Sequence, residues 1–442
     1  MSVRAGPKRF ASFITKRSRA CSLGRVGAVA IAALPFFVTI TLLIAGYLFH
    51  APGTAHADDY QAYGYSALNY SDIIWLYLRD QATTHLRPFL DYRLEYPPLT
   101  GGLIYALGFA RDLRLYFALT YGVLSICALA TVAALNGLPG TKRWYFAATP
   151  ALILYTGLNW DLAAIAMLAL ALLAYDRRRD GWGTVALVLA IWLKLFPIVF
   201  LLSIVIERLR ERRYRAAATI SGIFVVGSLA LNLPLARANL AGWGYFFTFN
   251  TSRQAEPSLW TLLPPLGVAQ IDSISLGMLV VGSLVLTAFA YRAKCPVALP
   301  LGGAVLLWWL CINKVYSPQY GLWVYLVLAL LSFPSGLWRA FILLDLAYYY
   351  ASFQILYTST FAAPYSTGPL TSWQATYLLQ PLVAVRLALL LAMLCWIVGN
   401  TLARSDERAI ATSANAPAMT GAKKLRLSFS STVTRAWSLI RS

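Results

Sequence analysis

Residues 183–206 read GTVALVLAIWLKLFPIVFLLSIVI, and this stretch decides how the chain is folded. It is apolar and long enough to cross the roughly 30 Å of a bilayer's hydrocarbon core as one helix. Arginine clusters at 177–179 and 208–215 flank it, however, and short arginine-rich loops stay on the cytoplasmic side of a membrane. Because Pro197 removes a helical hydrogen bond and clashes with the preceding turn, we predict two short helices that turn at residues 194–197 and return to the same side.

The composition agrees with a membrane protein. Of 442 residues, 59% are hydrophobic and only 12% are charged, against a charged share of about 25% in soluble globular domains. This composition excludes an ordinary soluble enzyme. The net charge of +20 arises because 37 Lys and Arg outnumber 17 Asp and Glu. In a membrane protein such an excess reports topology, so we expect membrane lipids and no nucleic acid among the partners.

Apolar windows that can form membrane helices recur along the chain. They lie at 26–49, 115–135, 144–158, 161–175, 216–234, 274–291, 297–312, 320–333, 338–358 and 378–399. Together with the two short helices they predict an all-α polytopic membrane protein with about twelve transmembrane helices. Ala55-His56-Ala57 resembles a signal-peptidase site after the first window, but that window exceeds the apolar core of about 7 to 15 residues in a signal peptide, so we expect it to remain.

The charges orient this bundle in the plasma membrane. With both termini in the cytoplasm, most of the excess positive charge lies on the inner side, and the outer side is balanced and rich in carboxylates. This topology gives a basic cytoplasmic tail at 1–25, a membrane domain at 26–400 with outer loops at 50–98 and 236–273, and a second basic tail at 401–442. We expect this second tail to be disordered, with residues 425–440 forming only a weak amphipathic segment.

The outer loop 50–98 is where we expect chemistry, since it holds all three histidines and six acids. Within it, residues 70–79 are typical of an amphipathic helix at the membrane surface, with Ser71 as its cap and Asp72 in its first turn. The helix dipole favours an ionised Asp72 there and predicts a low to normal pKa. Two interpretations of Asp72 remain open: a helix-start carboxylate with only a local role, or a catalytic group.

A stiff turn follows at Glu95-Tyr96-Pro97-Pro98 and leads into a short apolar helix that ends near Ala110. If this segment re-enters the membrane from outside, Glu95 and Tyr96 would lie beside a cavity, where irregular backbone is tolerated at membrane depth, and we predict that both bind substrate. The alternative is a simple connector.

Polar residues also stand at the outer ends of later spans. Ionisable groups at membrane depth are costly and mark functional cavities by default. By contrast, we expect Asp345 and Arg386, which lie within the predicted spans, to pair with each other. The residues at outer ends that we predict to bind substrate are Asn159, Asp161, Lys194, Arg253, Lys314, Gln319 and Tyr320.

We predict neither a metal nor a cofactor. The histidines lack the fixed spacing of a helix-borne zinc motif, and the five cysteines form no CxxC pair. A Mg²⁺ or Mn²⁺ site on Asp72, or on Asp58 and Asp59, is the alternative.

The order of these motifs resembles glycosyltransferase family 87, the actinobacterial polyprenol-phosphate-mannose-dependent mannosyltransferases of the C-type (GT-C) membrane superfamily. The resemblance covers residues 25–400. Its most specific pieces are Ser71-Asp72-Ile73 with Glu95-Tyr96-Pro97-Pro98, Phe249-x-x-x-Arg253 with Ser258-Leu259-Trp260, and Asn313-Lys314-Val315-Tyr316-Ser317-Pro318-Gln319-Tyr320.

This resemblance implies a GT-C-like bundle that moves mannose from a polyprenyl-phosphate donor to a glycolipid or glycan acceptor during cell-envelope synthesis. The catalytic acid of that family lies in the first outer loop, at a distance from Tyr-Pro-Pro that Asp72 matches and Asp58 and Asp59 match poorly. Asp72 is therefore expected as the general base of an inverting transfer, with Asp58 or Asp59 as the alternative base. Cations and hydroxyls near the departing phosphate would be Lys194, Arg253, Lys314 and Tyr320, and aromatic residues that could stack on sugars are Trp75, Tyr96, Trp260 and Tyr316.

Other functions remain open from the residues alone. A transporter or flippase of a lipid-linked sugar fits twelve spans, but such proteins usually show two similar halves, which this chain lacks. A transferase of another sugar, such as arabinofuranose, and a non-catalytic partner in envelope assembly are further alternatives.

Overall fold

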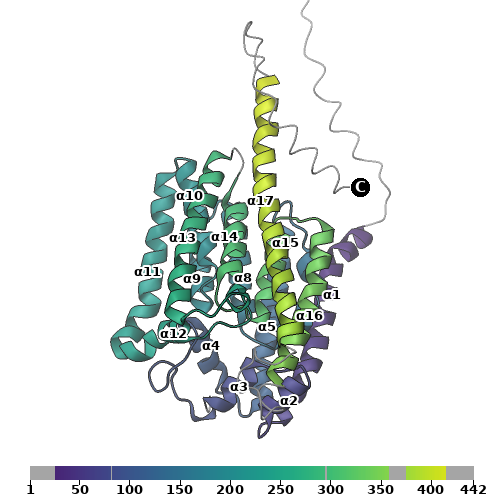
Figure 1. The fold of residues 1–442 in the computed structure, drawn as a ribbon, viewed down its shortest axis with the longest axis vertical. Coiled ribbons are helices and arrows are strands. Elements are labelled where there is room, and N and C mark those ends of the chain that lie inside the picture. The colour runs from purple at the N-terminus through teal and green to yellow at the C-terminus, as the bar shows by residue number, and fades with distance from the viewer. Residues whose placement is uncertain (1–24, 81, 294–295, 358–374, 415–442) are drawn as a thin grey trace, which may run out of the picture.

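The computed structural model describes residues 25–80, 82–293, 296–357 and 375–414. Within these ranges the regular structure is helical, with irregular connections and one isolated bridge between Pro88 and Tyr92. The predicted amphipathic segment 425–440 and most of the N-terminal tail 1–25 lie outside the described residues. The helices form an upright bundle with short elements gathered at one end (Figure 1). We call this the loop end, because it carries the loop 50–98.

Five helices of the described chain are long and apolar enough to cross a membrane. The protein is therefore a helical membrane protein by composition and length, and the count of twelve spans stays a prediction. The five helices are α1 (Arg25–His50), α5 (Leu113–Gly137), α11 (Tyr214–Ala238), α13 (Val268–Arg292) and α17 (Gln380–Ala414).

Further helices complete the bundle. They are α8 (Asp161–Asp176), α9 (Asp180–Leu193), α10 (Ile198–Arg210), α14 (Ala298–Ile312), α15 (Gly321–Leu330) and α16 (Ser335–Tyr357). Trp323 and Tyr325 of α15 and most of α8 are buried, so α15 and α8 lie in the core of the bundle.

The predicted break in residues 183–206 is confirmed. α9 ends at Leu193, Lys194 has an extended backbone, and α10 begins at Ile198 directly after Pro197. A helix end leaves carbonyl groups without intrahelical partners, and one of these, on Leu193, accepts a hydrogen bond of 2.6 Å from the Thr100 hydroxyl. Lys194 therefore lies in the extended link between α9 and α10 and not within a helix.

The prediction of a single helix over 144–158 is wrong. The structure has two short helices, α6 (Trp144–Ala147) and α7 (Ala151–Tyr155), because Pro150 cannot continue the first one. The irregular residues that follow α7 carry the chain to Asn159 at the start of α8.

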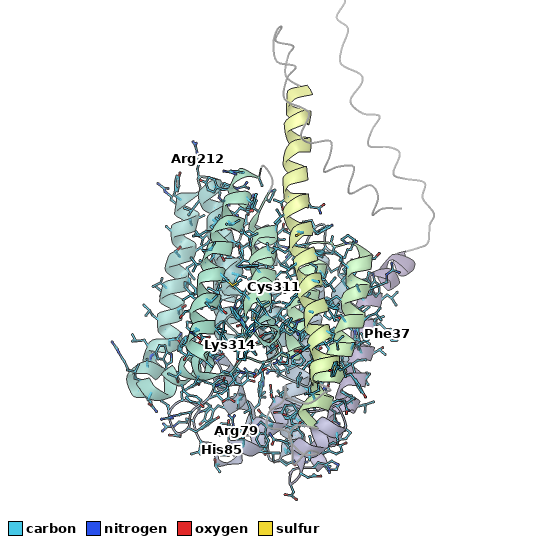
Figure 2. The ribbon with its side chains drawn as sticks, viewed as in Figure 1. Phe37, Arg79, His85, Arg212, Cys311 and Lys314 are labelled. Carbon is cyan, nitrogen blue, oxygen red and sulfur yellow. The ribbon has the colours of Figure 1, made fainter. Side chains whose placement is uncertain are left out.

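Ion pairs link the helices at the end opposite the loop end. Arg208, which is 3% exposed, pairs with Asp180 at 2.9 Å and with Glu207 at 3.1 Å. Glu207 also accepts hydrogen bonds from the backbone nitrogens of Val297 and Ala298, and so caps the first turn of α14. Arg212 lies at this end, and Arg79 and His85 lie at the loop end (Figure 2).

Short helices build the loop end. α2 (Tyr60–Ser66), α3 (Asp72–Arg79) and α4 (Pro98–Leu107) come from the loop 50–98, and α12 (Leu240–Ser252) comes from the loop 236–273. The two loops touch at Gly242, where an added Cβ would lie 1.9 Å from the carbonyl oxygen of Phe89. The close backbone approach fixes α12, and with it Arg253, against the loop that carries Asp72.

Candidate functional site

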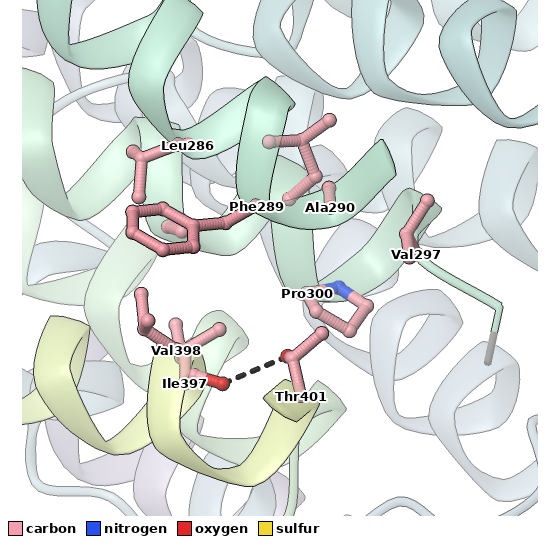
Figure 3. Close-up of a pocket in the computed structure, with 10 residues that line it drawn as sticks. Leu286, Phe289, Ala290, Val297, Pro300, Ile397, Val398 and Thr401 are labelled. Atoms are coloured by element: carbon pink, nitrogen blue, oxygen red, sulfur yellow. Dashed lines mark hydrogen bonds between the residues drawn. The ribbon is translucent and has the colours of Figure 1, made fainter. Parts of the chain in front are cut away.

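An apolar cleft, open to one side, lies between α13, α14 and α17 (Figure 3). The lining residues are Leu286, Phe289, Ala290, Val297, Pro300, Leu301, Ala304, Ile397, Val398 and Thr401. Thr401, the one polar side chain among them, donates its hydroxyl to the carbonyl of Ile397. The cleft holds no group able to transfer a proton or bind an anion, whereas the loop end carries acids, a lysine and an arginine.

Asp72 begins α3, as predicted, and its backbone is held by the turn after α7. The Ser71 hydroxyl accepts from the backbone nitrogen of Ile74 at 3.4 Å and donates to the carbonyl of Gly157 at 2.5 Å. The backbone nitrogen of Asp72 donates to the carbonyl of Leu158 at 2.9 Å. The same short turn that ends in Asn159 therefore fixes the position of Asp72.

Three predicted site residues meet at the Asp72 carboxylate. The Asn159 amide donates to Oδ2 of Asp72 at 2.7 Å and to the Tyr96 hydroxyl at 2.8 Å, and the Tyr96 hydroxyl lies 3.4 Å from the same oxygen. Asn159 is 1% exposed, whereas Asp72 and Tyr96 are partly accessible. The contacts from Asn159 and Tyr96 to Oδ2 therefore orient the Asp72 carboxylate.

The predicted low to normal pKa of Asp72 is wrong. Burial raises the pKa of this carboxyl above its ordinary value, against the positive charge of Lys194 and the hydrogen bonds from Asn159 and Tyr70, which lower it. The helix dipole argument considered only the first turn of α3 and not the surroundings that cover it. A carboxyl with a raised pKa is a stronger base once it is ionised, which suits proton transfer.

The raised pKa gives a test by pH. If Asp72 acts as a base, replacing Asn159 by Ala removes a hydrogen bond that favours the ionised form, so the pKa of Asp72 rises further. We expect the acid limb of the kcat/KM profile for transfer to move to higher pH, with a smaller change on the alkaline side. Asn400→Ala, at the opposite end of the bundle, is the control and should leave the profile in place; an unmoved limb in the Asn159 variant would contradict Asp72 as the titrating base.

Asp161 and Lys194 form a buried ion pair beside this cluster. Lys194 Nζ lies 3.0 Å from Oδ2 of Asp161, and the indole nitrogen of Trp323 donates to Oδ1 at 2.7 Å. The Asp161 side chain is fully buried, whereas that of Lys194 is 17% exposed. Asp161 therefore positions the lysine, and its role in substrate binding stays a prediction.

Lys194 faces the Asp72 cluster. Its ammonium lies 5.2 Å from the centre of the Tyr96 ring, a cation–π contact that links the two groups. Tyr320, which stacks on Trp323 at 4.0 Å, continues the wall of the site beyond the lysine. The structure thus places a partly exposed cation next to a partly exposed carboxylate.

The loop after α12 supplies a second cation. Arg253 leaves α12 at its end and pairs with Glu256 at 2.5 Å. Burial lowers the pKa of Arg253, but the Glu256 carboxylate outweighs it and raises this pKa above its ordinary value, and Tyr320 and Tyr96 lie near enough to contribute. Glu256 was not among the predicted residues; its spacing of three from Arg253 was the only signal for it in the sequence.

Two other predicted binding residues serve as supports. Lys314 is 6% exposed, and its ammonium bonds to the Asp272 carboxylate at 2.7 Å and to the carbonyl of Thr251 at 3.1 Å, so it joins the loop 313–320 to α12 and α13 (Figure 2). Gln319 is likewise buried at 6% exposure. Of the aromatic residues proposed for sugar stacking, Trp260 and Tyr316 are also buried.

The remaining predicted acids make no hydrogen bond to the Asp72 carboxylate in the described structure. Glu95 is held by Arg79 in a two-fold contact of 2.6 and 2.9 Å, and no hydrogen bond joins it to Asp72 in the described structure. Asp58 and Asp59 are exposed, and Asp59 contacts only His56 among the described ion pairs, at 3.3 Å. Neither of them reaches Asn159 or Tyr96, so they lack the orienting contacts that Asp72 has.

Asp345 and Arg386 do not pair with each other among the described residues, so that prediction is wrong. Asp345 accepts hydrogen bonds from the hydroxyls of Tyr155 at 2.8 Å and Tyr325 at 3.2 Å. Arg386 stacks on the ring of Tyr316 at 3.7 Å and donates to the carbonyl of Pro257 at 2.7 Å. The guanidinium therefore supports the loop that carries Arg253.

Within the described ranges, no group of three or more His, Cys, Asp or Glu is arranged to hold a metal ion. No family model matches the chain, and comparisons with curated proteins and with solved structures found no significant match.

Proposed function

We propose that this protein is an integral membrane glycosyltransferase. It moves a hexose, most simply mannose, from a polyprenyl-phosphate donor to a glycolipid or glycan acceptor on the outer face of the plasma membrane. The observation that supports this proposal is the partly accessible Asp72 carboxylate, oriented by Asn159 and Tyr96 and flanked by Lys194. A base and a cation side by side are what a transfer from a phosphate leaving group needs.

The proposed reaction is a single inverting displacement. Asp72 takes the proton of the acceptor hydroxyl. At the same time the oxygen of that hydroxyl attacks the anomeric carbon and forms the new glycosidic bond. The bond from that carbon to the phosphate oxygen breaks, and its electron pair leaves with the polyprenyl phosphate. Lys194 and Arg253 stabilise the charge that gathers on the phosphate. The proton stays on Asp72 until it passes to water.

The test is direct. Purified protein in lipid nanodiscs, given polyprenyl-phosphate mannose and a mannosylated lipid acceptor, should produce an elongated glycolipid with the configuration inverted. A labelled arabinofuranose donor tests the alternative sugar in the same assay. Movement of the lipid-linked sugar across proteoliposomes without a product would instead identify a transporter.

Metal removal forms a separate prediction. In this proposal Lys194 and Arg253 neutralise the charge of the departing phosphate, a task that a metal ion performs in other enzymes. We therefore expect EDTA to leave the rate of transfer within about twofold of its untreated value. Added Mg²⁺ or Mn²⁺ should not restore or raise it. A rate that falls with EDTA and returns with one of these ions would support the metal site on Asp72 or on Asp58 and Asp59.

A further inference from the structure

The two cations of the site are neutralised in different ways. Asp161 is fully buried against Lys194 and is bonded on its other oxygen by Trp323, so the carboxylate of this pair is closed off from solvent. In the second pair the Arg253 and Glu256 side chains are 29% and 37% exposed. Both the Nε and a terminal nitrogen of Arg253 contact one oxygen of Glu256 at 2.5 Å. Only this second pair is open to exchange.

The backbone around Glu256 is held independently of its side chain. Its own nitrogen donates to the carbonyl of Lys314 at 2.9 Å, and the next carbonyl, that of Pro257, accepts from Arg386 at 2.7 Å. Arg386 is itself 2% exposed and packed on Tyr316. The Glu256 carboxylate can therefore leave Arg253 by rotation of its side chain alone, while the loop stays in place.

A carboxylate and a phosphate offer an arginine the same partner, namely anionic oxygens in the plane of the guanidinium. We infer that the Glu256 carboxylate competes with the lipid phosphate for Arg253. It pairs with Arg253 in the empty site and is displaced when the phosphate of a prenyl phosphate binds. This inference rests on the proposed function, because it takes the donor to be a lipid phosphate.

The exchange has two consequences for the site. Arg253 is neutralised before the donor arrives, so a partly buried cation never stands without a counter-charge. A prenyl alcohol has no anionic oxygens and cannot displace Glu256, so the pair weakens binding of every anion by the same factor and leaves neutral lipids unaffected.

The direction in which one substitution changes the affinity for a prenyl phosphate tests this inference. With geranylgeranyl phosphate as the probe and calorimetry as the readout, Glu256→Gln should bind about threefold to fivefold more tightly than the wild type, from the usual strength of a partly exposed pair. A residue that merely contacts the substrate would give weaker binding instead. Asp91→Asn is the matched control, since Asp91 also pairs with an outer-loop arginine, Arg87, at 2.9 Å outside the site; its affinity should not change.

A second background separates competition from simple repulsion. In Arg253→Gln, the added change Glu256→Gln should have no effect on affinity, because there is no cation left to compete for. Equal or weaker binding by Glu256→Gln alone, or tightening that persists without Arg253, overturns the inference and leaves the proposed function standing. If the wild type binds geranylgeraniol as tightly as its phosphate, the lipid-phosphate donor is excluded, and both proposals fall together.

Discussion

Replacement of Asp72 by Asn is expected to lower the rate of sugar transfer about 1,000-fold, within the range that general-base catalysis contributes. The amide keeps the shape of the side chain and an oxygen that accepts from Asn159, but it cannot take the proton of the acceptor hydroxyl. Binding of the donor should be nearly unchanged, so the loss should appear in kcat and not in KM. The measurement is single-turnover transfer from labelled donor by purified protein.

Stability provides the control for this variant. Burial raises the pKa of Asp72 in the folded protein above its unfolded value, so the ionised carboxylate costs stability once the pH exceeds the unfolded value, and that cost grows until the folded value is passed. A neutral Asn avoids this cost, and the melting temperature of the variant at neutral pH should equal or exceed that of the wild type.

Asp58→Asn and Asp59→Asn should transfer sugar within about twofold of the wild type. Near-normal turnover in Asp72→Asn would exclude it as the base, and a collapse in either exposed-acid variant would move that role to the loop 50–60.

The parts of the structure that local physics decides were predictable from the sequence. The break at Lys194 follows from a proline and from arginines on both sides of one apolar run. The start of α3 at Asp72 follows from the Ser71 cap, because that side chain acts on the backbone three residues away. In both cases the cause lies within a few residues of its effect.

Features that depend on distant contacts were not predictable in this way. Asp345 and Arg386 have opposite charges in neighbouring apolar segments, but the structure surrounds each with aromatic residues, whose rings and hydroxyls provide the contacts. The raised pKa of Asp72 likewise depends on burial by the turn that follows α7. These outcomes require knowing which helices pack together, and residue spacing does not contain that information.

The ion pair of Asp161 and Lys194 gives the second large effect. Either Asp161→Asn or Lys194→Met leaves one buried charge without its partner, which costs about 3 kcal/mol of unfolding free energy, the lower end of the usual range because the lysine is partly exposed. Transfer should fall at least about 100-fold in both, since the cation that faces the phosphate is removed or misplaced. Chemical denaturation in detergent micelles and the transfer assay measure the two effects.

The double variant Asp161→Asn, Lys194→Met separates the two roles of this pair. Removing both charges leaves no uncompensated ion, so the free energy of unfolding should return to within about 1 kcal/mol of the wild type, and the coupling between the two substitutions should be correspondingly large. Transfer should stay at least about 100-fold low, because a stable site without Lys194 still lacks its cation. A double variant that is both stable and active would show that the pair only holds α8 to the end of α9. A double variant that remains unstable would mean that Trp323 needs the charged form of residue 161, since its indole nitrogen donates to that carboxylate at 2.7 Å.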